Sequence, residues 1–192
     1  MIFHNAGKYN GDENSLPKRE HPKGAIQFKE CANMQTLSFV ANGGSILTMA
    51  LLFIPFILLG KPYIKANAIW LIVALFANIL SMIPHEYLHA ICYKKDVYLY
   101  SDIKNGLLFV LGPEDMSKTR FVFMCLLPNI VFGWIPYIIF LIFPNLSGLG
   151  LFGILCTGMG FGDYINVFNA LTQMPKGAKT YLSGMHSYWY VP

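Results

Sequence analysis

Residues 67–92 read NAIWLIVALFANILSMIPHEYLHAIC, an apolar stretch longer than the roughly 20 residues that a helix needs to cross a bilayer. Near its C-terminal end it nevertheless carries His85, Glu86 and His89. Burying an ionisable side chain in a membrane costs several kcal/mol, so residues kept there usually bind a ligand or take part in chemistry. The stretch predicts a transmembrane helix that carries a functional site.

The composition of the chain indicates a membrane protein. Hydrophobic residues make up 55% of the 192 residues and charged residues only 12%, whereas soluble domains have about 25% charged residues. Long apolar segments lie at about residues 37–59, 67–92, 121–143 and 146–172. The expected fold is an all-α polytopic membrane protein with about four transmembrane helices.

Residues 1–36 are polar and lack the short apolar core and small-residue cleavage site of a secretory signal. We expect them to form a cytosolic polar tail, followed by an integral-membrane domain over residues 37–192. The cysteines are scattered without a CxxC pair, which predicts small core residues and no disulfide or thiolate site. They are Cys31, Cys92, Cys125 and Cys156.

The basic residues set the expected orientation, because positively charged loops stay on the cytoplasmic side. With the N-terminus inside, only Lys61 and Lys65 of the fourteen basic residues lie outside. This predicts a multi-pass protein of the cell membrane with both termini cytoplasmic. The formal charge of +4 suits a surface facing anionic lipid, and no basic run with interleaved aromatics indicates nucleic acid.

The loop over residues 94–118, between the second and third expected helices, has the pattern of a small cytoplasmic β-hairpin. Two β-prone runs, residues 97–100 and 107–110, flank Asn105-Gly106, which is a strong turn signal. The hairpin either covers the helix ends or offers an edge strand to an extended peptide.

The segment His85-Glu86-Tyr87-Leu88-His89 has the spacing of a zinc site. On a helix, residues i and i+4 share a face, so both imidazoles can bind one ion while Glu86 serves as general acid and base. Pro84 removes a backbone hydrogen bond just before the motif and predicts a kink. The alternative, two histidines satisfied by packing alone, leaves Glu86 as a buried acid without a role.

Asp163, in the fourth apolar segment, is the expected third ligand, because a catalytic zinc site has three protein ligands and an open position. His85 precedes Lys94 by nine residues (94 − 85), and Asp163 precedes Thr172 by nine (172 − 163). At about 1.5 Å per residue, both lie about 13 Å from the cytoplasmic ends of their helices.

Two asparagines are further candidates. Asn129 follows Pro128 at a similar depth and could bond a ligand carboxylate or the reacting carbonyl, or only repair the backbone at the proline. Asn166 lies one turn from Asp163 and could support a ligand or serve helix packing.

With HExxH in one span and an aspartate two spans later, the chain resembles the site-2-protease class of intramembrane metalloproteases. Its small size, Gly162-Asp163 and the tail around Pro175-Lys176-Gly177 make it most similar to a family of small bacterial membrane proteins described as putative zincin peptidases. The resemblance covers roughly residues 67–192. It implies Zn²⁺ bound by His85, His89 and Asp163, with Glu86 catalytic. Site-2 proteases usually have a glycine after the aspartate, whereas Tyr164 follows Asp163 here.

Two functions follow from these patterns. The first is a zinc metalloendopeptidase that cuts membrane or membrane-proximal protein or peptide substrates. The second is a non-proteolytic membrane scaffold or regulator that keeps a zinc site. Glu86 favours the enzyme, because a purely structural zinc site has no use for an acid beside its ligand. Two imidazoles and a carboxylate suit zinc, and the same ligands could also bind another divalent ion. The sequence carries no signal for substrate identity or oligomeric state.

Overall fold

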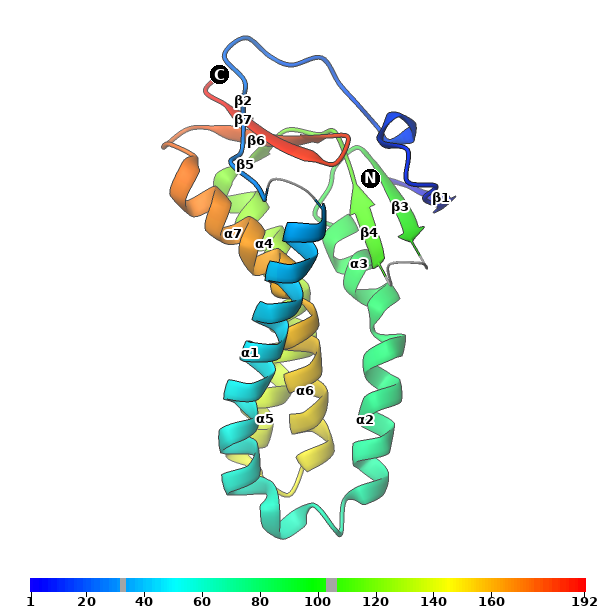
Figure 1. The fold of residues 1–192 in the computed structure, drawn as a ribbon, viewed down its shortest axis with the longest axis vertical. Helices are drawn as coiled ribbons and strands as arrows, with labels where there is room; N and C mark the ends of the chain where they lie inside the picture. The colour runs from blue at the N-terminus through cyan, green and yellow to red at the C-terminus, as the bar shows by residue number, and fades with distance from the viewer. Residues whose placement is uncertain (32–33, 103–106) are drawn as a thin grey trace. The chain divides into compact units, whose positions relative to one another are not determined.

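The computed structural model describes residues 1–31, 34–102 and 107–192. The chain divides into two compact units, shown as a ribbon in Figure 1. The sheet unit comprises Met1–Glu30, Glu86–Cys125 and Asn166–Pro192, and the helical unit comprises Cys31–His85 and Leu126–Ile165.

The helical unit is built around α6 (Ser147–Met159), which packs against three other helices (Figure 1). These are α1 (Met34–Gly60), α2 (Ala68–Leu80) and α5 (Ile135–Ile142). A short 3-10 turn, η2 (Lys61–Tyr63), follows α1. The core is largely aromatic and consists of Phe56, Tyr137, Phe140 and Ile154.

Glycines allow α6 to approach its neighbours closely. A Cβ atom on Gly153 would lie 2.7 Å from both the carbonyl oxygen of Gly133 and the backbone nitrogen of Tyr137. Backbone atoms cannot rotate away as a flexible side chain can, so this position excludes any side chain. Close backbone approach at small residues is the usual way in which helices pack inside membranes.

Among the described residues, two helical segments are long and apolar enough to cross a membrane, Thr36–Tyr63 and Lys118–Ile142. Two further pairs of helices meet the same criteria if each pair forms one bent span. They are α2 with α3 (Met82–Ala90), bent by 43°, and α6 with α7 (Phe161–Gln173), bent by 51°. The four apolar segments of the sequence correspond to these four regions, which give two candidate spans, or up to four if each bent pair is one span.

The bend between α2 and α3 has a local cause. Pro84 has no N–H to donate to the carbonyl of Leu80, the residue at which α2 ends. The regular pattern resumes one residue later, where the His85 amide donates to the Ser81 carbonyl at 2.8 Å. The kink expected just before the motif is present, centred at Ser81.

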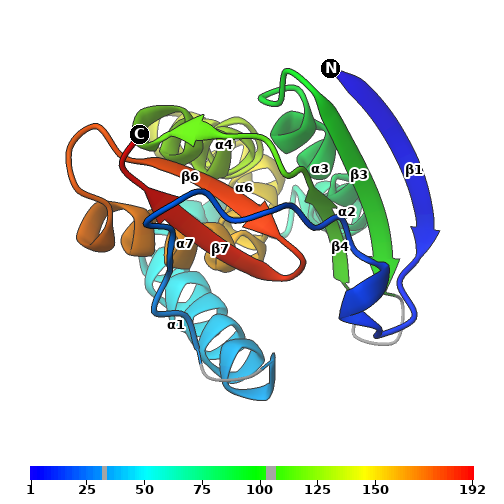
Figure 2. The same cartoon turned by 90° about the horizontal axis from the view of Figure 1, so that it is seen from above.

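The sheet unit contains two sheets (Figure 2). In the three-stranded sheet, β3 (Asp96–Asp102) pairs in parallel with β1 (Ile2–Lys8) and antiparallel with β4 (Leu107–Leu111). The four-stranded sheet is antiparallel and has the order β2 (Ile26–Gln27), β7 (His186–Tyr190), β6 (Lys179–Ser183) and β5 (Met116–Ser117). A 3-10 turn, η1 (Glu13–Ser15), follows β1.

The expectation of an all-α fold was therefore wrong, although the chain is mostly helical. The expected hairpin strands are present as β3 and β4, with Leu99 paired to Val110. Its turn at Asn105-Gly106 lies outside the described residues. Sequence reasoning missed the local hairpin of β6 and β7, and each of the remaining strands depends on a partner far along the chain. β1, for example, joins a strand more than ninety residues away.

The sheet unit has its own hydrophobic core, which includes Phe28, Tyr93, Phe121 and Met174. The helix α4 (Lys118–Pro128) contributes Phe121, Met124 and Cys125 to it. All four cysteines of the chain are free thiols, and Cys125 and Cys156 are buried.

Glu114, a buried carboxylate, fixes the connection between α3 and β3, the next strand along the chain. Glu114 is 9% exposed, and its Oε2 accepts the backbone amides of Lys94 at 2.6 Å and Lys95 at 2.8 Å. Its Oε1 accepts a bond from Arg120 at 2.6 Å, and the Nε of Arg120 donates to the Cys92 carbonyl at 2.8 Å. Burial alone would raise the pKa of Glu114, but these donors outweigh burial and lower the pKa from its ordinary 4.5.

This network predicts a pH-dependent stability. Because the folded-state pKa of Glu114 lies below the unfolded value, its carboxylate stabilises the fold at neutral pH, and the effect disappears as the pH falls through the folded-state pKa. Glu114→Gln should lower stability by about 1–3 kcal/mol at pH 7. Thermal unfolding in detergent should show this difference between wild type and variant shrinking only below pH about 4.5.

The matched control is Glu20→Gln, which changes an exposed glutamate of the same unit. A wild-type advantage over Glu114→Gln that stayed constant down to pH 3 would contradict the role assigned to the carboxylate charge.

Candidate metal centre

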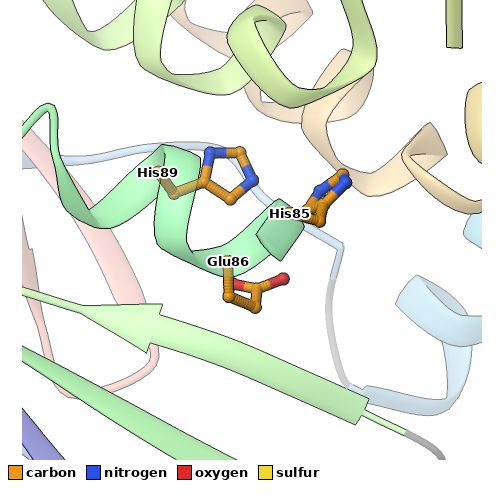
Figure 3. Close-up of side chains that lie close together, drawn as sticks. All are labelled: His85, Glu86 and His89. Carbon is orange, nitrogen blue, oxygen red and sulfur yellow. The ribbon is translucent and has the colours of Figure 1, made fainter. Parts of the chain in front are cut away.

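The helix α3 brings the three residues of the motif together. Their metal-ligating atoms, one nitrogen each from His85 and His89 and one oxygen from Glu86, all lie within 4.8 Å of one another. Figure 3 shows the two imidazoles and the carboxylate on successive turns of this helix. The spacing of i and i+4 produces this arrangement because 3.6 residues complete one turn.

His89 is held by a backbone carbonyl. The residue is 6% exposed, and its Nδ1 lies 2.9 Å from the carbonyl oxygen of Met124 in α4. A carbonyl oxygen only accepts hydrogen bonds, so Nδ1 carries the proton and Nε2 keeps its lone pair. Metal-binding histidines usually have this kind of support, because it fixes both the tautomer and the direction of the ring.

His85 meets Asp163 inside the helical unit. The Nε2 of His85 lies 3.2 Å from the Oδ2 of Asp163, and their side chains are only 14% and 15% exposed. Asp163 lies in the first turn of α7, where its own amide donates to the Gly160 carbonyl at 3.0 Å. The positive end of the helix dipole favours a negative charge at this position.

Asn129 contacts the same carboxylate. Its Nδ2 donates to the Oδ2 of Asp163 at 2.8 Å, and the residue is 1% exposed. It begins η3 (Asn129–Trp134), a π-helical segment that directly follows Pro128. Such π segments are rare in proteins and frequently lie at functional sites.

Asn166 lies in α7, one turn after Asp163. Asn166 belongs to the sheet unit and lines a shallow hollow of that unit, together with Phe28, Glu30, Phe121, Asn169 and Ser187. Asn169 in turn accepts a bond from Gln173 at 3.1 Å.

Sequence reasoning missed two features around these residues. The Met124 carbonyl could not have been found, because a backbone acceptor leaves no mark in the residue types. The second feature is a bond from the Nε1 of Trp134 to the hydroxyl of Tyr164 at 3.0 Å. Tyr164 follows Asp163, so this bond ties the segment containing Asn129 to the segment containing the aspartate.

The donor set fits zinc. Zinc in proteins is bound by imidazole nitrogens, thiolates and carboxylate oxygens, and two histidines from one helix are among its commonest ligands. Within the described part of the chain, the group formed by His85, Glu86 and His89 is the one that could hold a metal ion. Asp163, in contact with His85, supplies a further carboxylate.

The comparisons with known proteins agree with this chemistry. A protein-family model described as "Putative zincin peptidase" matches residues 78–179, the stretch that contains every residue of the site described above. No curated protein and no solved structure matches the chain. Because the matched stretch covers more than half of the 192 residues, the chain belongs to the family of putative zincin peptidases.

Proposed function

We propose that this protein is an integral-membrane zinc metallopeptidase that hydrolyses peptide bonds in membrane or membrane-proximal proteins. The observation that carries the proposal is the convergence of His85, Glu86 and His89 within 4.8 Å on a helix that continues an apolar, bent segment. Membership of the zincin family supports the same chemistry.

In this proposal His85, His89 and Asp163 hold the zinc ion. The Nδ1 of His89 is bonded to the Met124 carbonyl, which makes Nε2 the nitrogen that would bind the ion, and Asp163 contacts His85. Three protein ligands leave an open position, as catalytic zinc sites require. When bound, zinc acidifies water and polarises the carbonyl of the peptide bond.

Glu86 moves the proton. It follows the first ligand directly, so its carboxylate is within reach of the same site while the two imidazoles occupy the neighbouring positions. It accepts a proton from the attacking water and then delivers it to the leaving amine, which makes it a general base and afterwards a general acid. A structural zinc site needs no such residue.

The arrangement of the site supports a likeness to the site-2-protease class. The motif lies in one apolar segment and Asp163 in another, with the segment that carries Asn129 between them in the sequence. Site-2 proteases usually have glycine after the aspartate, whereas this chain has Tyr164, whose hydroxyl is bonded by Trp134. The Tyr164 hydroxyl is thus engaged by Trp134, while the Asp163 carboxylate contacts His85 and Asn129.

Zinc content tests the ligand set. Protein purified in detergent should hold about one zinc ion per chain, and His85→Ala, His89→Ala and Asp163→Ala should each lose it. His186→Ala is the matched control, because it removes an exposed histidine of the sheet unit and should leave zinc unchanged. Elemental analysis gives the answer. Full occupancy in Asp163→Ala, with zinc lost from both motif-histidine variants, would remove the aspartate from the proposed ligands.

Activity tests the role of Glu86. Glu86→Gln should retain zinc and fold while losing about 100- to 10,000-fold in peptidase rate, because only proton transfer is removed. The measurement is the rate at which new protein N-termini appear when purified enzyme is added to detergent-solubilised membranes from cells lacking the gene. If zinc-loaded wild type and Glu86→Gln release the same N-termini at the same rate, the scaffold function replaces the enzyme.

Topology tests the orientation. Twelve of the fourteen basic residues lie inside when both termini are cytoplasmic. In a background whose native cysteines are replaced by alanine, Lys61→Cys should react with a membrane-impermeant maleimide on intact cells. Lys176→Cys should react only after permeabilisation. The opposite pattern would place both termini outside the cell.

A further inference from the structure

Gly160 has no backbone reason to be a glycine. It ends α6 with φ −77° and ψ 15°, a conformation that residues with a side chain adopt without strain. Its amide donates to the Cys156 carbonyl at 3.1 Å, as any non-proline residue could. The feature that only glycine supplies here is the missing side chain.

The missing side chain leaves room for Asn129. A Cβ atom on Gly160 would overlap the Oδ1 of Asn129 and would lie 2.6 Å from its Cγ and 2.7 Å from its Nδ2. Gly162 provides a contrast two residues later, because a Cβ atom there would meet nothing within 4 Å. The requirement for space is therefore specific to Gly160.

Asn129 is not free to move aside. It is almost fully buried, and its Nδ2 is committed to the Oδ2 of Asp163 at 2.8 Å. Asp163 is itself tied back to Gly160 through its amide. The segment from Gly160 to Asp163 thus closes around the Asn129 amide, and pushing that amide away would break its bond to Asp163 or displace the carboxylate.

We infer that Gly160 and Asn129 act together as positioning residues that orient the Asp163 carboxylate toward His85 for zinc. This inference rests on the proposed function, since it assumes that Asp163 is a ligand. The hydrogen bond from Asn129 restricts rotation of the Asp163 carboxylate. Gly160 leaves the space that Asn129 needs in order to form this bond. Partners that orient ligands typically change metal affinity 10- to 100-fold when removed.

The test measures zinc affinity by competition with a chelator, using the full chain in detergent. Asn129→Leu keeps the number and branching of the side-chain heavy atoms and removes the donor, so it should weaken zinc binding by roughly 10- to 100-fold. Gly160→Ala should weaken binding to a similar extent, because its methyl group displaces Asn129. The control Gly162→Ala adds the same methyl group in open space and should bind zinc as wild type does.

A double variant separates positioning from packing. In Asn129→Ala with Gly160→Ala, the alanine at position 129 no longer reaches the added methyl group. Its zinc affinity should therefore equal that of Asn129→Ala alone, which is the non-additivity expected of two residues acting through one contact. Thermal unfolding with zinc removed by chelator reports any purely structural effect of each variant.

Three outcomes would overturn the inference. The first is wild-type zinc affinity in Asn129→Leu, which decides the matter even if Gly160→Ala fails to fold. The second is a loss of thermal stability without zinc in Asn129→Leu and Gly160→Ala while their zinc affinity stays unchanged, since this would show a packing role alone. The third is wild-type protein that binds no zinc, which refutes the proposed function as well and is thereby distinguished from the other two.

Discussion

The contact between the Asp163 carboxylate, His85 and Asn129 is the interaction around which the helical unit is arranged. A carboxylate buried among apolar helices must be given donors, because leaving it unpaired costs far more than most single interactions contribute. Each of the three residues lies beside a break in regular helix. His85 follows Pro84 and the bend at Ser81, Asn129 follows Pro128 and begins a π segment, and Asp163 follows the end of α6 at Gly160. The irregular backbone in this unit is thus concentrated where polar side chains meet.

The C-terminal end of α3, the helix that carries the motif, is fixed by a different set of contacts. His89 is bonded to the Met124 carbonyl, and Arg120 donates to the Cys92 carbonyl just after α3 ends. A cation close to the C-terminal end of a helix is favourable because of the helix dipole. Glu114 accepts a hydrogen bond from Arg120 and two more from the backbone amides of Lys94 and Lys95, which precede β3. The Glu114 network therefore fixes the C-terminal end of α3, the helix that carries Glu86 and His89, although Glu114 and Arg120 lie outside the motif.

The sequence predicted those features that depend on local chemistry. Ionisable residues within apolar segments identified the motif and Asp163, Pro84 predicted the bend, and two β-prone runs predicted β3 and β4. It did not predict β1, because strand pairing between distant segments has no local signature, and it also missed the local hairpin of β6 and β7. The hollow that Asn166 lines also includes Phe28 and Ser187 from distant parts of the chain, a grouping that local sequence does not reveal.

Gly160 illustrates why part of the site could not be predicted at all. Its role depends on an empty volume, and residue type alone does not distinguish a glycine that provides flexibility from one that provides room. The backbone angles exclude the first explanation, and the position of Asn129 supports the second. A Cβ atom on the neighbouring Gly162 would meet nothing within 4 Å, so only the first of these two glycines is required for space. A glycine needed for space is paired with a particular neighbour, and its importance disappears when that neighbour is made smaller.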